Sequence, residues 1–147
     1  MQGEPITILL VEDEPAHAEI VRRNFETMRI ENTLKHVSDG EAALDYLHRK
    51  NVFSDPASSP RPCLILLDLR LPKVDGLQVL KTIKTDPDLN NIPVVVLTTS
   101  ASEADIAMAY TNNVNSYLVK PADFGQFSEL LKTLGTYWMS WNHHSNT

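Results

Sequence analysis

Cysteine is nearly absent from the chain. The 147 residues include one cysteine, Cys63, so no disulfide can form within the chain. This usage fits a reducing compartment, and we expect a cytoplasmic protein. No histidine or asparagine next to Cys63 marks it as a nucleophile, so we interpret it as a small apolar residue at the start of a strand.

Clustered positive charge and long apolar runs are also missing. Thirteen Lys and Arg residues against 19 Asp and Glu residues give a net charge of −6, which argues against a nucleic-acid surface. No apolar run approaches the ~20 residues that span a bilayer. Residues 1–5 lack the basic and then apolar pattern of a signal peptide. We therefore expect no nucleic-acid partner and no membrane partner.

Glycine is sparse, and the histidines form no metal-binding pattern. Gly40 and Gly76 stand alone, so the chain has no Gly-rich phosphate loop. Asp75-Gly76 reads as a structural turn. The five histidines have no metal-ligand spacing with Cys or Glu partners, and we interpret them as surface or helix residues: His17, His36, His48, His143 and His144.

What the sequence does contain is an alternation of strand and helix patterns. Five short apolar runs are rich in β-branched residues: Ile6–Val11, Thr33–Val37, Leu64–Leu67, Val94–Leu97 and Tyr117–Val119. Several are continuous, as expected of strands buried on both faces, and segments with helical spacing separate them. The pattern predicts a doubly wound α/β fold, with a five-stranded parallel sheet and helices on both faces.

The length predicts one domain over residues 1–147. The Ser- and Pro-rich segment 51–62 is expected to be a surface loop rather than a domain boundary. About residues 136–147 would extend the last helix into a tail, with no room for an output domain. We therefore expect the output to be a protein–protein contact.

Polar side chains follow four of the apolar runs. Glu12 and Asp13 follow the first run, Asp68 the third, Thr98 the fourth and Lys120 the fifth. In a parallel sheet these ends lie along one edge, where ligands of such folds bind. Strands do end in polar loops for structural reasons alone. Four strands that deliver carboxylates, a hydroxyl and a lysine together favour a functional site.

These residue types suit phosphoryl transfer. Three carboxylates at close range repel one another and call for a cation, and oxygen ligands with few protein groups suit Mg²⁺. Lys120 and the Thr98 hydroxyl could contact phosphoryl oxygens. An aspartate can act as the nucleophile and form an aspartyl phosphate. Positioning and charge neutralisation are most of what such a transfer needs.

The motifs "ILLVEDE", "LLDLRLPKVDG", "PVVVLTTS" and "SYLVKP" occur in the order and spacing of the receiver domains of two-component response regulators. The chain resembles this family over roughly residues 6–134. The resemblance implies the flavodoxin/CheY-like sheet order 2-1-3-4-5. It also implies a phosphoacceptor that assists its own phosphorylation and dephosphorylation rather than an enzyme with a separate substrate.

The resemblance implies a role for each matching residue. Asp68 would be the phosphoacceptor. Asp13 and Asp68 would bind Mg²⁺ or Mn²⁺ together with the Arg70 backbone carbonyl, and Glu12 would act beside the metal or through water. Lys120 and Thr98 match the lysine and hydroxyl of the family. Thr98 and its switch aromatic, Tyr117, would carry the signal.

A closer resemblance extends to small stand-alone regulators paired with cyanobacterial phytochrome histidine kinases. The motifs that support this resemblance are "SPRPCLILLDLRLPKVDG", "DPDLNNIPVVVLTTS" and the aromatic C-terminus. It implies a light-regulated sensor histidine kinase as phosphodonor, with the pigment on the kinase. Four positions depart from the commonest receiver pattern, which leaves the phosphate lifetime open: Glu12, Thr99, Arg70 and Ser100.

The sequence also bears on three alternative functions. A pseudo-receiver that acts only by interaction is expected to lack Asp13, Asp68 or Lys120, and all three are present. A hydrolase with an aspartyl nucleophile would need a second carboxylate two residues on, where this chain has Arg70. A flavodoxin-like carrier needs a phosphate loop after the first strand, where acidic residues 12–14 would repel a flavin phosphate.

The last helix carries a continuous apolar stripe: Phe124, Phe127, Leu131, Leu134, Trp138 and Trp141. A helix over Asp123–Trp141 would be ~28 Å long, and a five-residue strand covers only ~17 Å. We expect the end with the two tryptophans to overhang the sheet. It would form an interface of a homodimer through the fourth helix, fifth strand and fifth helix. The alternative is that both rings cover the domain's own edge.

Overall fold

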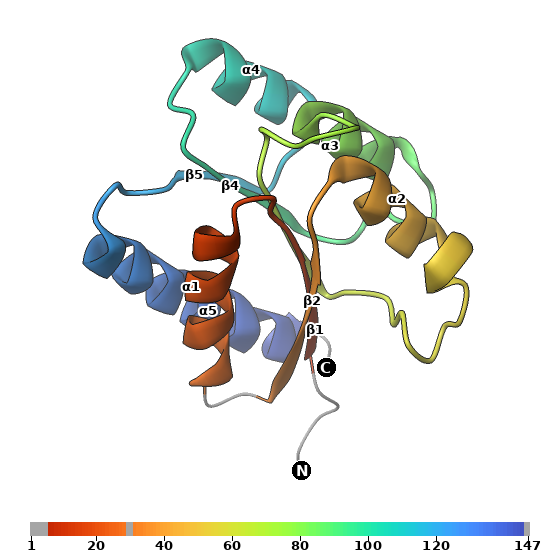
Figure 1. The fold of residues 1–147 in the computed structure, drawn as a ribbon, viewed down its shortest axis with the longest axis horizontal. Helices are drawn as coiled ribbons and strands as arrows, with labels where there is room; N and C mark the ends of the chain where they lie inside the picture. Colours follow the sequence, from red (N-terminus) through yellow and green to blue (C-terminus); the bar gives the residue numbers. More distant parts are fainter. Residues whose placement is uncertain (1–5, 29–30, 146–147) are drawn as a thin grey trace.

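The computed structural model describes residues 6–28 and 31–145, with side chains as far as Trp138. Strands and helices alternate along the chain (Figure 1). The strands are β1 Ile6–Val11, β2 Asn32–Val37, β3 Leu64–Leu67, β4 Val94–Thr98 and β5 Ser116–Val119. The helices are α1 Pro15–Glu26, α2 Gly40–His48, α3 Gly76–Thr85, α4 Glu103–Thr111 and α5 Phe124–Ser145, with a 3₁₀ turn at Asn51–Phe53.

The five strands form one parallel sheet in the order β2-β1-β3-β4-β5. Each predicted apolar run falls within a strand, and the ends differ by one residue at most. β1 lies between β2 and β3, and Val11 at its carboxyl end is opposite both Val37 and Leu67. The predicted fold class and strand order are therefore confirmed, and the carboxyl ends of the strands meet at one edge.

Helices cover both faces of the sheet, α1 and α5 on one face and α2, α3 and α4 on the other (Figure 1). Alternate strand residues supply the two cores: Leu10 and Leu66 pack toward α1 and α5, whereas Leu9 and Leu67 pack toward α2 and α3. Burial on both faces explains why the strand sequences are continuously apolar.

Side-chain caps and two glycines fix the helix starts near the functional edge. Asp39 accepts a hydrogen bond from the Ala42 N–H at the start of α2, which makes it the N-cap of this helix. A Cβ on Gly40 would lie 1.9 Å from the Val74 carbonyl oxygen, and one on Gly76 would lie 2.4 Å from that of Asp68. Only glycine allows α2 and α3 to pack this closely against the loop that follows β3.

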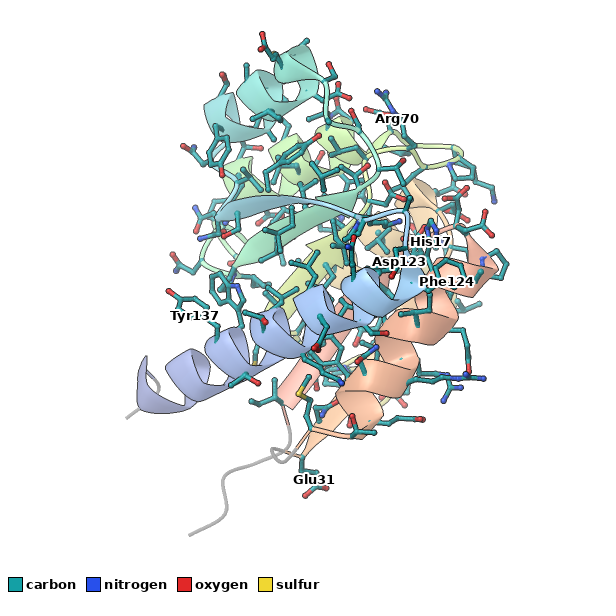
Figure 2. The ribbon with its side chains drawn as sticks, turned by 90° about the vertical axis from the view of Figure 1, so that its left-hand side faces the viewer. His17, Glu31, Arg70, Asp123, Phe124 and Tyr137 are labelled. Carbon is teal, nitrogen blue, oxygen red and sulfur yellow. The ribbon has the colours of Figure 1, made fainter. Side chains whose placement is uncertain are left out.

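The predicted overhang of the last helix is partly wrong. Helix α5 runs to Ser145, but the Trp138 ring is half-buried and packs against the core between α1, α5 and the sheet. The exposed aromatic in this turn is Tyr137, which projects away from the domain (Figure 2). Trp141, the other predicted interface residue, has its side chain outside the described residues. Within the described residues, no helix is both long and apolar enough to cross a membrane.

Candidate functional site

Lys120, directly after β5, is the centre of a buried polar cluster at the carboxyl edge of the sheet. Its Nζ donates to Glu12 Oε1 at 2.5 Å and to Asp68 Oδ2 at 3.1 Å. The Lys120 side chain is 1% exposed, and that of Glu12 is 2% exposed. A buried ammonium needs such partners, because an isolated charge in the interior is strongly unfavourable. The structure thus brings together three residues that the sequence predicted to meet.

The Asp68 carboxylate is held ionised. Its backbone N–H continues the β1–β3 pairing by donating to the Val11 carbonyl oxygen, and its Oδ1 accepts from the Arg70 N–H at 3.2 Å. Burial alone would raise the pKa of Asp68. The charge of Lys120 and hydrogen bonds from Thr98, Lys120 and the Arg70 N–H outweigh burial and lower the pKa below its ordinary value. An ionised carboxylate is the form that can attack an electrophile.

Glu12 behaves differently from Asp68. Burial raises the pKa of Glu12 to about 7, despite the opposing hydrogen bond and charge of Lys120. Its second oxygen, Oε2, accepts from the Glu14 N–H at 3.2 Å. The sequence placed Glu12 beside a metal or bound to it through water. In the structure its carboxylate contacts Lys120 directly as well as lying in the acidic cluster.

The acidic cluster consists of Glu12, Asp13 and Asp68, each with a carboxylate oxygen within 4.8 Å of the others. Asp13 is exposed, whereas the other two are buried. Carboxylate oxygens around an opening to water suit Mg²⁺ or Mn²⁺, which keep part of their water shell. The cluster therefore fits the predicted cofactor, and the Arg70 backbone carbonyl remains a predicted ligand.

Thr98 and Tyr117 join a hydrogen-bonded network beyond this cluster. The buried Thr98 accepts at Oγ1 from the Ser100 N–H at 3.4 Å, and the Tyr117 hydroxyl donates to the Ser100 carbonyl oxygen at 2.8 Å. Asp105 in the first turn of α4 accepts from the Ser100 hydroxyl at 2.6 Å and from the Arg70 guanidinium at 2.5 Å. The two predicted switch residues are thus linked through Ser100.

Sequence reasoning missed two histidines at the site, because it set all five aside as surface or helix residues. His17 Nδ1 lies 3.0 Å from Lys120 Nζ, and His36 Nε2 lies 2.8 Å from the Glu12 carbonyl oxygen. The His17 ring, on α1, meets the Phe127 ring of α5 edge-on. Burial, together with the charge of Lys120, lowers the pKa of His17. No local pattern signals the His17 contact, because it joins residues 103 positions apart.

Comparison with known proteins identifies the family. The sequence profile of the response regulator receiver domain matches residues 8–132. The chain belongs to the response regulator receiver family. Such receivers serve two-component signalling, in which a sensor histidine kinase is the partner. The predictions of the family and of a response regulator are confirmed.

Two curated relatives illustrate the range of this family. The chain is 46% identical to the probable methanogenesis regulatory protein FilR2 of Methanothrix harundinacea, over 95% of this chain and 87% of that protein. It is 42% identical to the response regulator Rcp1 of Synechocystis, over 92% of this chain and 90% of that protein. Both likenesses extend over nearly the full length of each protein.

Solved structures agree with the fold and with the kind of site. Mn²⁺-bound Rcp1 superposes with a TM-score of 0.87 at 42% identity and covers 91% of this chain and 94% of its own. The phosphorylated cyanobacterial phytochrome response regulator RcpA superposes with a TM-score of 0.88 at 40% identity, over 92% and 95% of the two chains. The predicted Mg²⁺ or Mn²⁺ cofactor is confirmed at the level of the family, and this chain has the acidic cluster to match.

Proposed function

We propose that the chain is a single-domain response regulator that accepts a phosphoryl group on Asp68 from a sensor histidine kinase. The observation that carries the proposal is the pairing of a buried Lys120 with Asp68 and Glu12, two members of the acidic cluster. In the transfer, the N–P bond of the donor phosphohistidine breaks and an O–P bond to Asp68 forms. The imidazole of the donor leaves with the electron pair.

The site residues divide this work between them. Asp68 supplies the nucleophilic oxygen, and its lowered pKa keeps it ionised. Asp13 and Asp68, with the Arg70 backbone carbonyl and Glu12 through water, would hold Mg²⁺ or Mn²⁺, which would neutralise charge on the transferring group. Lys120 supplies a fixed positive charge near the new phosphoryl oxygens, and the Thr98 hydroxyl supplies a donor. This self-assisted transfer distinguishes the chain from an enzyme with a separate substrate.

The decisive experiment offers acetyl phosphate or phosphoramidate with Mg²⁺ to the purified chain. We expect one phosphate per chain, stable in acid and labile in base, and none after chelation of the metal. Asp68→Asn should accept none, and Asp13→Ala should lose the metal-dependent reaction. One stoichiometric phosphate on Asp68→Asn would contradict the assignment. A wild-type chain that takes no phosphate would favour the alternative, a pseudo-receiver that acts as an interaction module.

The kinase in this proposal is of the phytochrome type and its setting is the cytoplasm, with neither nucleic acid nor membrane as partner. Likeness to Rcp1 and to the phytochrome regulator RcpA supports the pairing. Likeness to the methanogenesis regulator FilR2 makes a kinase without a pigment the competing donor. Transfer from purified phosphorylated phytochrome, compared with an unrelated histidine kinase at equal concentration, separates the two. Equal rates from both kinases would contradict the pairing.

Phosphorylation would reach the surface through Thr98 and Tyr117. The phosphoryl group would attract the Thr98 hydroxyl, and the space vacated would admit the Tyr117 ring. The hydrogen bond from Tyr117 to the Ser100 carbonyl oxygen must then break. Such a switch moves populations only by its different free energy in the two states. Thr98→Ala should accept phosphate and lose the response, which partner binding before and after phosphorylation measures.

The output of this single domain would be a homodimer or kinase contact through α4, β5 and α5. Five of the six large apolar side chains that the described residues expose come from these three elements: Met108, Tyr110, Val119, Phe124 and Tyr137. Exposed apolar groups gathered on one side mark contact surfaces. Light scattering of a Met108→Ser/Tyr137→Ser variant tests the dimer. Unchanged mass and unchanged kinase affinity would contradict this surface.

A further inference from the structure

The third contact of Lys120 has no part in the function proposed so far. An ammonium has three N–H donors, and here each faces one acceptor: Glu12 Oε1, Asp68 Oδ2 and His17 Nδ1. Two of these acceptors are charged carboxylates. His17 is the third, and it comes from α1 rather than from the end of a strand. It completes the coordination of a cation that is almost entirely buried.

The contact fixes the state of the imidazole. Lysine can only donate, so Nδ1 must present its lone pair and the ring proton must reside on Nε2. The ring itself is held by packing: it meets Phe127 of α5 edge-on, with ring centroids 5.8 Å apart and planes at 90°. Phe127 is part of the core between α1, α5 and the sheet. His17 is therefore a rigid, neutral acceptor.

His17 also differs from the other two acceptors in what happens to it during the reaction. Glu12 and Asp68 belong to the acidic cluster, and Asp68 receives the phosphoryl group in the proposed transfer. In the proposed transfer Asp68 must exchange partners, and Glu12 would also interact with the metal's water. His17 is outside that cluster, so its bond to Lys120 can persist throughout. It is the contact of Lys120 whose acceptor neither takes the phosphoryl group nor belongs to the acidic cluster, so it can hold the ammonium in place during the transfer.

We propose that His17 is a positioning residue for phosphoryl transfer, whose neutral Nδ1 holds the Lys120 ammonium where the phosphoryl oxygens arrive. The inference rests on the proposed function of Asp68 as phosphoacceptor. Transfer of this kind depends on placement of charge, and a displacement of about 1 Å costs up to ~100-fold in rate. Without this acceptor, the position of the Lys120 ammonium would be set only by its carboxylate partners, and it would shift when they move.

Two substitutions of similar shape distinguish the role of His17 as a hydrogen-bond acceptor from its role in side-chain packing. Asn carries its Oδ1 two bonds from Cβ, as His carries Nδ1, whereas Leu has the same branching without an acceptor. With acetyl phosphate at saturating Mg²⁺, we expect His17→Leu to slow phosphorylation about tenfold and His17→Asn to stay within about threefold of the wild type. Dissociation constants for Mg²⁺, measured by calorimetry, should stay within about threefold in both variants, because His17 is no ligand.

A double-variant cycle tests whether the effect passes through Lys120. In a Lys120→Met chain, His17→Leu should change the remaining rate by less than about twofold, since the two residues act as one unit. Full wild-type rate in His17→Leu, an Asn variant as slow as the Leu variant, or an undiminished Leu effect without Lys120 would each overturn the proposal. Thermal unfolding of each variant shows whether the fold is kept. Failure of the proposed function would appear separately, as a wild-type chain without phosphate on Asp68.

Discussion

Helices α3 and α4 are neighbours on the same face of the sheet, yet they bury very different amounts of surface. α3 places Gly76, Val79, Leu80 and Ile83 in the interior, whereas α4, described in full, buries only Ala109. The strands show the same contrast: β3 is buried at every position and β5 at none. Regions with few buried apolar contacts open at lower free energy. One side of the sheet thus holds the site rigidly, and the other can move.

The largest loss of stability should follow from a cavity made under α3, on the well-packed side of the sheet. Ile83→Ala removes a fully buried side chain of α3, and we expect a loss of about 3–4 kcal/mol in the free energy of unfolding. Met108→Ala in α4 is the control, because Met108 is half exposed and should cost less than about 1 kcal/mol. Urea titration followed by circular dichroism measures both. Equal losses would contradict the contrast between the two helices.

A somewhat smaller loss of stability is expected from a substitution where α2 meets the loop after β3. Gly40→Ala gains about 1 kcal/mol of helix propensity, but its Cβ would lie 1.9 Å from the Val74 backbone oxygen. The backbone must move, and we expect a net loss of about 2–3 kcal/mol. Gly125→Ala in α5 is the control, since its nearest neighbour is the Asp123 side chain at 3.1 Å. A Gly40→Ala protein as stable as the control would mean that this contact is loose.

The side of the sheet with α4 and β5 is held mainly by polar contacts. Removal of a charged side chain there should therefore destabilise the structure only locally. Asp105→Ala deletes the acceptor shared by Ser100 and Arg70. Arg70 is 62% exposed, and water screens its ion pair with Asp105. We therefore expect the substitution to lower the free energy of unfolding by about 1 kcal/mol in total. Amide hydrogen exchange in α4 should accelerate about fivefold, with no change in α3. Glu103→Ala, in the same turn, controls for the loss of an acidic residue from the helix start.

The smallest effect on stability belongs to the exposed surface of α4. Tyr110 is 52% exposed, and Tyr110→Ser should change the free energy of unfolding by less than about 0.5 kcal/mol. Association or kinase binding should nevertheless weaken, because the ring belongs to the proposed contact surface. Sedimentation of the phosphorylated and unphosphorylated variant reports this. A large stability loss would place Tyr110 in the packing of the domain instead.

The fold could be predicted from the sequence because burial on both faces leaves a plain pattern. The apolar runs at Ile6–Val11 and Leu64–Leu67 coincide with β1 and β3. The meeting of Glu12, Asp68 and Lys120 followed from the same rule, since parallel strands end at one edge. These predictions needed the strand order and no detail of side-chain packing.

Other features depend on angles that no local pattern encodes. The Trp138 ring was expected to overhang the sheet, but the direction of α5 turns it onto the core. The ring of His17 reaches Lys120 because Phe127 and the packing of α1 against α5 set its position. Similarly, the Arg70 side chain, from the loop after β3, meets Asp105 in the first turn of α4. Each contact joins segments whose relative placement is decided by the packed core.

Glu12 and Lys120 are 108 positions apart in the sequence, which has a consequence for how the protein is made. A ribosome delivers the N-terminal strands first, and with them the carboxylates of Glu12, Asp13 and Asp68. Until the chain extends past β5, Lys120 is not present to counter their repulsion. The growing chain can assemble β1, β2 and β3 early, but the site is the last part to close. An incomplete chain therefore has Asp68, the proposed phosphoacceptor, without its counter-charge, and the proposed transfer has to wait for Lys120.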